Sequence, residues 1–281
     1  MSINNMRKLF IISFIIIIMF SIGYYSTKYD VLARYPYNDE NHRNIIREKL
    51  NMEQINYIIE YSIEPTYFIE FIDSPRFNIY NSFYYNEINN IYFDIDSNDV
   101  VLLYELGKEL YDVDSLFLLM NEYHYTTLLE WFYMDKSNLN LISNPSNVNT
   151  ILDDNNTILT RKHPNLYRIE SYLTNNVDIF LDTRIKNSIN NMCSAINTKF
   201  ESTTCGDIII NKGYVSYNQQ SLLYEQDNSE DKPGHSYYQL GLTFDIDIEH
   251  DSDIYQYIVN NASRFNFKLI EDESLVLRFK G

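Results

Sequence analysis

The chain has 281 residues, enough for about two ordinary domains, and its 45% hydrophobic and 22% charged residues are typical of a globular rather than a disordered protein. A formal net charge of −17 argues against nucleic acid as a partner, because phosphates would be repelled, and also disfavours docking onto anionic lipid headgroups. The two cysteines, Cys193 and Cys205, are too few for a disulfide scaffold and lack the spacing of a thiolate metal site. The sequence leaves two alternatives for this pair, a single disulfide between them or two free thiols.

Residues 1–28 have the pattern of a signal anchor. The basic pair Arg7 and Lys8 precedes an apolar run from Leu9 to Tyr25, close to the roughly 17 residues of the shortest single-pass helix. By the positive-inside rule, the basic pair predicts that the rest of the chain lies outside the membrane. We therefore expect a single-pass protein of the cell membrane with an extracytoplasmic C-terminal domain. Ser21-Ile22-Gly23 could serve as a weak cleavage site, so a secreted form is the alternative.

Residues 29–144 are expected to form a stalk and a helical module. The stretch 29–45 is polar and predicts the stalk, whereas from Ile46 to about Asn140 the apolar residues recur at helical spacing. Aromatic residues at helical spacing, including Trp131, are more often core than binding surface. A role of this module in protein interaction is one of the open hypotheses. Polar joints are expected between its helices, at 73–75 and 94–99.

The segment 144–147, Asn-Pro-Ser-Asn, marks the expected start of a C-terminal domain, residues 145–281. Helical spacing predicts an amphipathic helix over 184–200, and an apolar run predicts a buried strand over 207–210. Two further strands show strict alternation. In them Asp245 faces away from Leu242, Phe244 and Ile246, and Val276 faces away from Leu275, Leu277 and Phe279. The pattern predicts an α+β domain with a small antiparallel sheet packed on helices.

Three motifs in residues 145–281 resemble those of the VanY-type D,D-carboxypeptidases, zinc peptidases of the LAS type. Gly213-Tyr214-Val215-Ser216, followed by Gln220, resembles the family's GYRS motif and its later Gln. Residues 236–245 resemble the SxHxxGxAxD motif, with Ser236, Gly241 and Asp245 in register. Residues 273–279 resemble the ExWH segment, followed by an Arg and an aromatic residue. The resemblance rests on the order and the spacing of all three.

The resemblance implies removal of the terminal D-Ala from peptidoglycan stem peptides at a zinc ion. In the family two His and one Asp hold the metal, a Glu takes the proton of the bound water, and the Arg of GYRS holds the substrate. Only the Asp and the Glu are retained here, and one carboxylate does not hold catalytic zinc. The corresponding positions are the ligand positions Tyr238, Asp245 and Val276, the general-base position Glu273 and the substrate-Arg position Val215.

We therefore expect that the protein binds no zinc cofactor and that it is a catalytically inactive member of this family. It would act as a cell-wall binding or scaffold domain, with the membrane and peptidoglycan or a cell-wall protein as partners. The alternative is an active metallo-carboxypeptidase with an altered metal site, for which His235 and His250 are the nearby histidines. The acidic run 245–253 lacks the spacing of an EF-hand and is expected to be a solvated loop. The other histidines lie outside the motifs: His42, His124 and His163.

Overall fold

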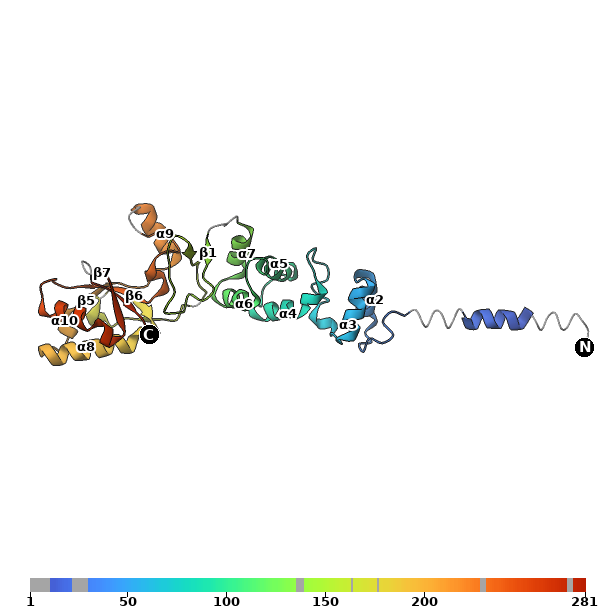
Figure 1. Cartoon of the computed structure of the whole chain (residues 1–281), viewed down its shortest axis with the longest axis horizontal. Coiled ribbons are helices and arrows are strands. Elements are labelled where there is room, and N and C mark those ends of the chain that lie inside the picture. Colours follow the sequence, from blue (N-terminus) through green and yellow to red (C-terminus); the bar gives the residue numbers. More distant parts are fainter. Residues whose placement is uncertain are drawn as a thin grey trace, which may run out of the picture. The chain divides into compact units, whose positions relative to one another are not determined.

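The computed structural model describes residues 11–21, 30–134, 139–162, 164–175, 177–227, 231–271 and 275–281. The chain divides into two compact units, residues 1–104 and residues 105–281 (Figure 1). The first is helical where it is described, and the second combines helices with small sheets. The α+β class expected for the C-terminal part is therefore observed in the second unit.

At the N-terminus, residues 11–21 form a helix with exposed apolar side chains, such as Phe20 at 77% exposure. Among the residues that the structure describes, no helix has both the length and the apolar character needed to cross a membrane. The other parts of the expected anchor, residues 1–10 and 22–28, lie outside the described residues.

The first unit is built from short helices, some of which have a side-chain cap at the N-terminus. Asp39 accepts a hydrogen bond from the backbone N–H of His42, and Asn51 and Gln54 form a reciprocal capping box. These caps satisfy N–H groups that a helix start would otherwise leave without partners. The helices are α2 (Glu40–Lys49), α3 (Met52–Glu60), α4 (Ser82–Ile91) and α5 (Ser97–Gly107, which continues into the second unit), with the 3-10 turns η1 (Pro65–Tyr67) and η2 (Ile79–Asn81).

The polar segment before α2 is packed, in contrast to the stalk expected over residues 29–45. Leu32 and Tyr35 are buried in the core of the first unit, at 0% and 2% exposure. Arg43 of α2 explains the difference, because its guanidinium donates to the carbonyl oxygens of Leu32 and Tyr35. A side chain on the helix thus holds the preceding turn against the apolar core, which sequence polarity did not reveal.

The second unit begins with two helices and two pairs of short strands. Trp131 of α7 is buried and donates its indole N–H to the Tyr111 hydroxyl at 3.0 Å, so it belongs to the interior. The elements are α6 (Val113–Glu122), α7 (Tyr125–Tyr133), the parallel pair β1 (Asn140–Leu141) and β2 (Asn156–Thr157), and the antiparallel pair β3 (Leu166–Arg168) and β4 (Phe180–Asp182), with the turns η3 (Ser171–Leu173) and η4 (Thr183–Ile185).

The largest sheet described in the second unit has four antiparallel strands. Its order is β5 (Ile209–Lys212), β6 (Thr243–Asp247), β8 (Val276–Phe279) and β7 (Phe267–Glu271). Helices α8 (Lys186–Phe200) and α10 (Asp253–Asn261) lie on one side of it (Figure 1). Apolar residues of both helices share a buried core with the sheet, among them Ile189, Met192, Ile196, Ile258, Phe244 and Leu277.

The helix expected over 184–200 is confirmed, with η4 before α8. The strand expected over 207–210 begins two residues later, since Cys205, Gly206 and Asp207 form a left-handed turn, η5, with φ of 58°, 68° and 56°. Cys193 of α8 and Cys205 form a disulfide, which decides between the two thiol states that the sequence left open. The sequence analysis did not identify α9 (Tyr217–Gln226), α10 or β7 as elements.

The boundary expected at Asn144-Pro145 lies inside the second unit. A polar cluster spans it: the Arg161 Nε lies 3.1 Å from Glu122 Oε2, and the Arg161 Nη2 donates to Ser146 Oγ at 2.7 Å. Ser146 in turn donates to Glu122 Oε1 at 3.1 Å. Lys162 Nζ donates to the carbonyl oxygen of Met120 at 2.8 Å. The end of α6 is therefore hydrogen-bonded to residues on the far side of the expected boundary.

Candidate functional site

Two of the expected ligand positions lie side by side on the sheet. Asp245 of β6 and Val276 of β8 are direct cross-strand partners. Side chains of such partners share one face of the sheet, with Cβ atoms about 5 Å apart. Phe244 and Leu277, which form the neighbouring pair, belong to the core under α8 and α10. Because strand residues alternate between faces, Asp245 and Val276 lie on the face away from those helices, as the sequence predicts.

Tyr238 brings the third position to this face. It belongs to the 3-10 turn η6 (Tyr237–Leu240), which leads into β6. Gly241 ends the turn with φ 73°, a left-handed conformation that glycine adopts without steric cost. The Tyr238 hydroxyl donates a hydrogen bond to Asp245 Oδ1. The three ligand positions named by the motifs thus converge, and a phenol is hydrogen-bonded to the retained carboxylate.

Lys212 adds a positive charge to this cluster. On the sheet it is the β5 neighbour of Asp245, beside a register shift between Ile210 and Lys212. Its Nζ lies 4.4 Å from the centroid of the Tyr238 ring, within the range of a cation–π contact. An ammonium, a phenol, a carboxylate and the methyl groups of Val276 therefore occupy one patch of the sheet, which we call the Tyr238 cluster (Lys212, Tyr238, Asp245 and Val276).

Val215, at the substrate-Arg position, lies beside the same cluster. Its backbone N–H donates to the carbonyl oxygen of Tyr238 at 3.4 Å, and its side chain is 9% exposed. Ser216 then caps α9, with its Oγ accepting from the backbone N–H of Gln219. The fold therefore brings the first and second motifs together, but this position presents methyl groups rather than a guanidinium.

The Tyr238 cluster does not fit a catalytic zinc ion. Such an ion takes three nitrogen, oxygen or sulfur ligands and keeps one position open for water. Val276 supplies no donor atom, the Tyr238 hydroxyl directs its proton at Asp245, and the Lys212 ammonium would repel a cation. In the parts of the chain that the structure describes, no group of three or more His, Cys, Asp or Glu is arranged to hold a metal ion.

The other motif residues hold backbone in place. Gln220 is fully buried and donates from Nε2 to the carbonyl oxygen of Asp231 at 2.7 Å. Gly241 accepts from the backbone N–H of Asp182 through its carbonyl oxygen at 2.9 Å. Ser236 is 1% exposed, and its backbone N–H donates to Gln239 Oε1 at 3.4 Å. Ser236 and Gly241 thus flank the turn that positions Tyr238, and Gln220 holds the backbone at Asp231.

The remaining candidates do not join the cluster in the described structure. Glu273, the general-base position, lies outside the described residues, as does His163. His235 Nδ1 lies 2.6 Å from the carbonyl oxygen of Asp153, and the ring of His250 packs on Tyr255 with centroids 4.2 Å apart. In the acidic run, Asp247, Glu249 and Asp251 are exposed.

Lys212 is the residue of this site that sequence reasoning missed. Counting by twos from the buried Ile210 assigns Lys212 to the core face. The register shift between them breaks that count and turns Lys212 toward Asp245. A lysine directly before Gly213-Tyr214 was the only available signal.

No protein-family model and no curated protein matches this chain. Among solved structures it is similar to LdcB, an LD-carboxypeptidase described for its peptidoglycan recognition, at 17% identity over 51% of this chain and 81% of that one, with a TM-score of 0.41. It is also similar to a mutant of the vancomycin-resistance D,D-pentapeptidase VanY from a VanB-type cassette, in complex with Zn(II), at 17% identity over 48% and 89% of the two chains, with a TM-score of 0.39. A third similar structure is DacB from Streptococcus pneumoniae D39, at 19% identity over 44% of this chain and 85% of that one, with a TM-score of 0.28. At such identities the chemistry of this chain has to be argued from its own residues.

Proposed function

We propose that the C-terminal part of this protein is a VanY-like domain that binds at the cell wall without hydrolysing peptide. The observation that carries the proposal is the hydrogen bond from Tyr238 to Asp245, with Val276 directly opposite on the next strand. The three positions where the motif resemblance implies zinc ligands are together in space, yet they hold a phenol, a carboxylate and an aliphatic side chain. In this proposal the three positions of a peptidase centre are kept, while their donor atoms are replaced.

Loss of the metal and of the substrate Arg removes two separate contributions to catalysis. Zinc would lower the pKa of a bound water and polarise the scissile carbonyl. A guanidinium at the position of Val215 would orient the substrate and stabilise charge. A domain without both contributions can still recognise a ligand, since recognition needs only shape and hydrogen bonds. The ligand that we propose is peptidoglycan or a protein of the cell wall.

We further propose that this domain lies outside the cell membrane, held by the N-terminal segment as a single-pass anchor. The basic pair before the apolar run supports this orientation. The Cys193–Cys205 disulfide supports it independently, because such bonds persist in oxidising compartments. Protease added to intact protoplasts should degrade the C-terminal domain. Digestion only after lysis would refute the proposed orientation.

The decisive experiment measures metal content and D-Ala release on the purified chain. We expect no stoichiometric zinc and no release of D-Ala from a stem pentapeptide, and no change of either on Asp245→Ala. Cell-wall binding is measured in the same preparation by sedimentation with purified peptidoglycan, and we expect the chain to cosediment. Zinc that is lost on Asp245→Ala, together with D-Ala release, would instead establish the active carboxypeptidase with an altered metal site.

A gain-of-function variant tests the geometry itself. Tyr238→His with Val276→His would place two imidazoles around Asp245, and we expect that variant to bind zinc although the wild type does not. Tyr238→His alone is the matched control, since one imidazole and one carboxylate leave the ligand set incomplete. Turnover would need Val215→Arg in addition, because substrate orientation is a contribution separate from metal binding.

A further inference from the structure

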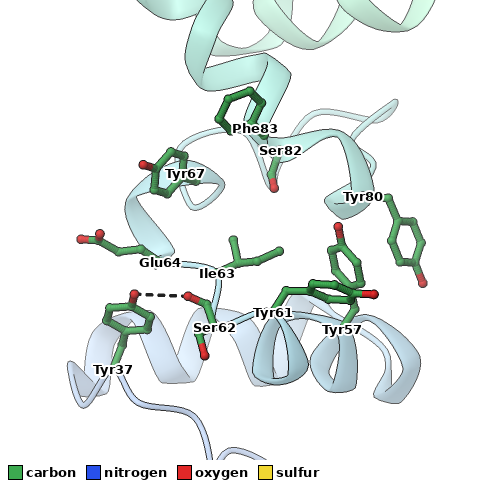
Figure 2. A pocket seen from close by; sticks show the side chains of 10 residues that line it. All are labelled: Tyr37, Tyr57, Tyr61, Ser62, Ile63, Glu64, Tyr67, Tyr80, Ser82 and Phe83. Carbon is green, nitrogen blue, oxygen red and sulfur yellow. Dashed lines mark hydrogen bonds between the residues drawn. The ribbon is translucent and has the colours of Figure 1, made fainter.

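A second candidate site lies in the first unit, far along the sequence from the motifs. A pocket of about 380 Å³ opens between α3, the turn after it, and the segment from η1 to the start of α4. This volume is at the small end of the range of roughly 300 to 1,000 Å³ for sites that take small ligands. Figure 2 shows aromatic side chains around most of its rim. They are Tyr37, Tyr57, Tyr61, Tyr67, Tyr80 and Phe83.

Three of the rings pack against one another, and several rings of the set stay exposed to solvent. Tyr57 lies 4.8 Å from Tyr61 and 4.6 Å from Tyr80, measured between ring centroids, with tilted and edge-on geometry. Tyr61, Tyr80 and Phe83 are 64%, 43% and 59% exposed. Exposed aromatic rings cost free energy in water unless a ligand covers them. The set is therefore pre-arranged for a ligand that meets several rings at once.

Two of the tyrosine hydroxyl groups that line the pocket have hydrogen-bond partners within the chain. Tyr37 donates to the carbonyl oxygen of Ser62 at 3.2 Å, the bond that is dashed in Figure 2. Tyr80 donates to Glu53 Oε1 at 3.3 Å, and desolvation together with the Glu53 carboxylate raises the pKa of Tyr80. Tyr80 thus stays a neutral donor. A ligand therefore meets chiefly the faces of these two rings, where the aromatic quadrupole is negative.

The charge within the pocket's lining is negative. Glu64 is the charged residue in its lining, and none of the described lining residues is Lys, Arg or His. The Glu64 side chain is exposed, and its carboxylate forms no ion pair within the described part of the chain. The guanidinium of Arg43 donates to the carbonyl oxygen of Tyr37 and to those of Leu32 and Tyr35, so backbone acceptors engage it.

We propose that this pocket binds an organic cation, an ammonium group held against the tyrosine faces beside the Glu64 carboxylate. A cation over an aromatic face gains electrostatic attraction, and a cluster of such faces is the usual cage for quaternary ammonium ions. The acidic balance of the chain, −17 overall, attracts cations over longer distances. The pocket lies within residues 37–83, so this inference does not rest on the function proposed for the C-terminal part.

The ammonium group could belong to a small molecule or to a lysine side chain, and titration calorimetry on the full-length chain separates the two. The small-molecule probe is choline, with its neutral isostere 3,3-dimethyl-1-butanol as the matched control. The peptide probe is N-acetyl-lysine N-methylamide, with its side-chain-acetylated form as control. We expect the charged member of at least one pair to bind roughly 5 to 30 times more tightly than its neutral control. Tighter binding of choline assigns a free quaternary ammonium, and tighter binding of the lysine derivative assigns a peptide.

Variants locate the binding. Glu64→Gln and Tyr61→Leu should each weaken binding of the preferred probe roughly 2- to 30-fold. Both side chains are exposed, so neither change should unfold the protein. Glu60→Gln removes the same charge from the end of α3, outside the lining, and should leave affinity within about 2-fold. Equal binding of charged and neutral probes, equal effects of Glu64→Gln and Glu60→Gln, or no saturable binding would overturn the proposal.

Discussion

At the scale of single residues, strand alternation predicted the sheet face of two of the three positions where the motif resemblance implies ligands. Asp245 and Val276 could be assigned to one face because alternation is a local property of an extended backbone. Alternation did not predict that the two residues pair across β6 and β8, and it did not predict the hydrogen bond from Tyr238 to Asp245. Lys212 was not predicted to belong to the site, because a bulge moves a side chain to the other face of the sheet without any sign in the composition. Sequence thus names the residues at the expected ligand positions, and only the structure identifies what they bond to.

The Tyr238 hydroxyl gives a prediction at this scale. Tyr238→Phe should lower the free energy of unfolding by about 1 to 2 kcal/mol, because it removes a donor from the half-buried Asp245 carboxylate. Tyr237→Phe is the matched control. Its ring, 4.2 Å from the Arg278 guanidinium carbon, is kept, so that this variant should stay within about 0.5 kcal/mol of the wild type. Urea titrations compare the three proteins. Equal losses in the two variants would mean that the bond to Asp245 contributes nothing of its own.

At the scale of elements, long periodic segments were predictable and irregular ones were not. The apolar stripe of α8 was visible because Ile189, Met192 and Ile196 recur at helical spacing. The turn that follows has left-handed φ at Cys205 and Asp207, where sequence gives no reason to expect it. It is held by tertiary contacts, including a 2.7 Å hydrogen bond from the Cys205 backbone N–H to Asn197 Oδ1. Such contacts displaced the start of β5 from its expected position.

The disulfide gives a prediction at the scale of elements. Cys193→Ser with Cys205→Ser should lower the free energy of unfolding by about 2 to 4 kcal/mol, because the bond closes a loop between residues 12 apart and holds a strained turn onto α8. Urea unfolding followed by circular dichroism measures the loss. Reduction of the wild type with dithiothreitol should produce a similar loss, and reduction of the double variant should change nothing. An unchanged midpoint after reduction would show that other contacts hold the turn.

At the scale of the whole molecule, composition and packing suggest different divisions of the chain. The change of pattern near Asn144-Pro145 is a feature of sequence, and the motif resemblance begins there. The compact units divide at residue 104 instead, because contacts between distant segments decide where a core ends. The pair of Arg161 and Glu122 joins residues 39 apart. Nothing local in the sequence marks such a pair.

The last prediction follows from that pair and compares two fragments, residues 145–281 and residues 105–281. The Arg161 side chain is 4% exposed, and in the shorter fragment it would lose Glu122. Breaking a buried ion pair from one side costs about 3 to 5 kcal/mol, because the remaining charge is left without compensation. We therefore expect the longer fragment to be the more stable one in urea titrations. In the longer fragment Arg161→Met should be tolerated better together with Glu122→Gln than alone, since the double change leaves no unpaired charge. Equal stability of the two fragments, with cooperative unfolding of residues 145–281 alone, would instead support a domain boundary at Asn144-Pro145.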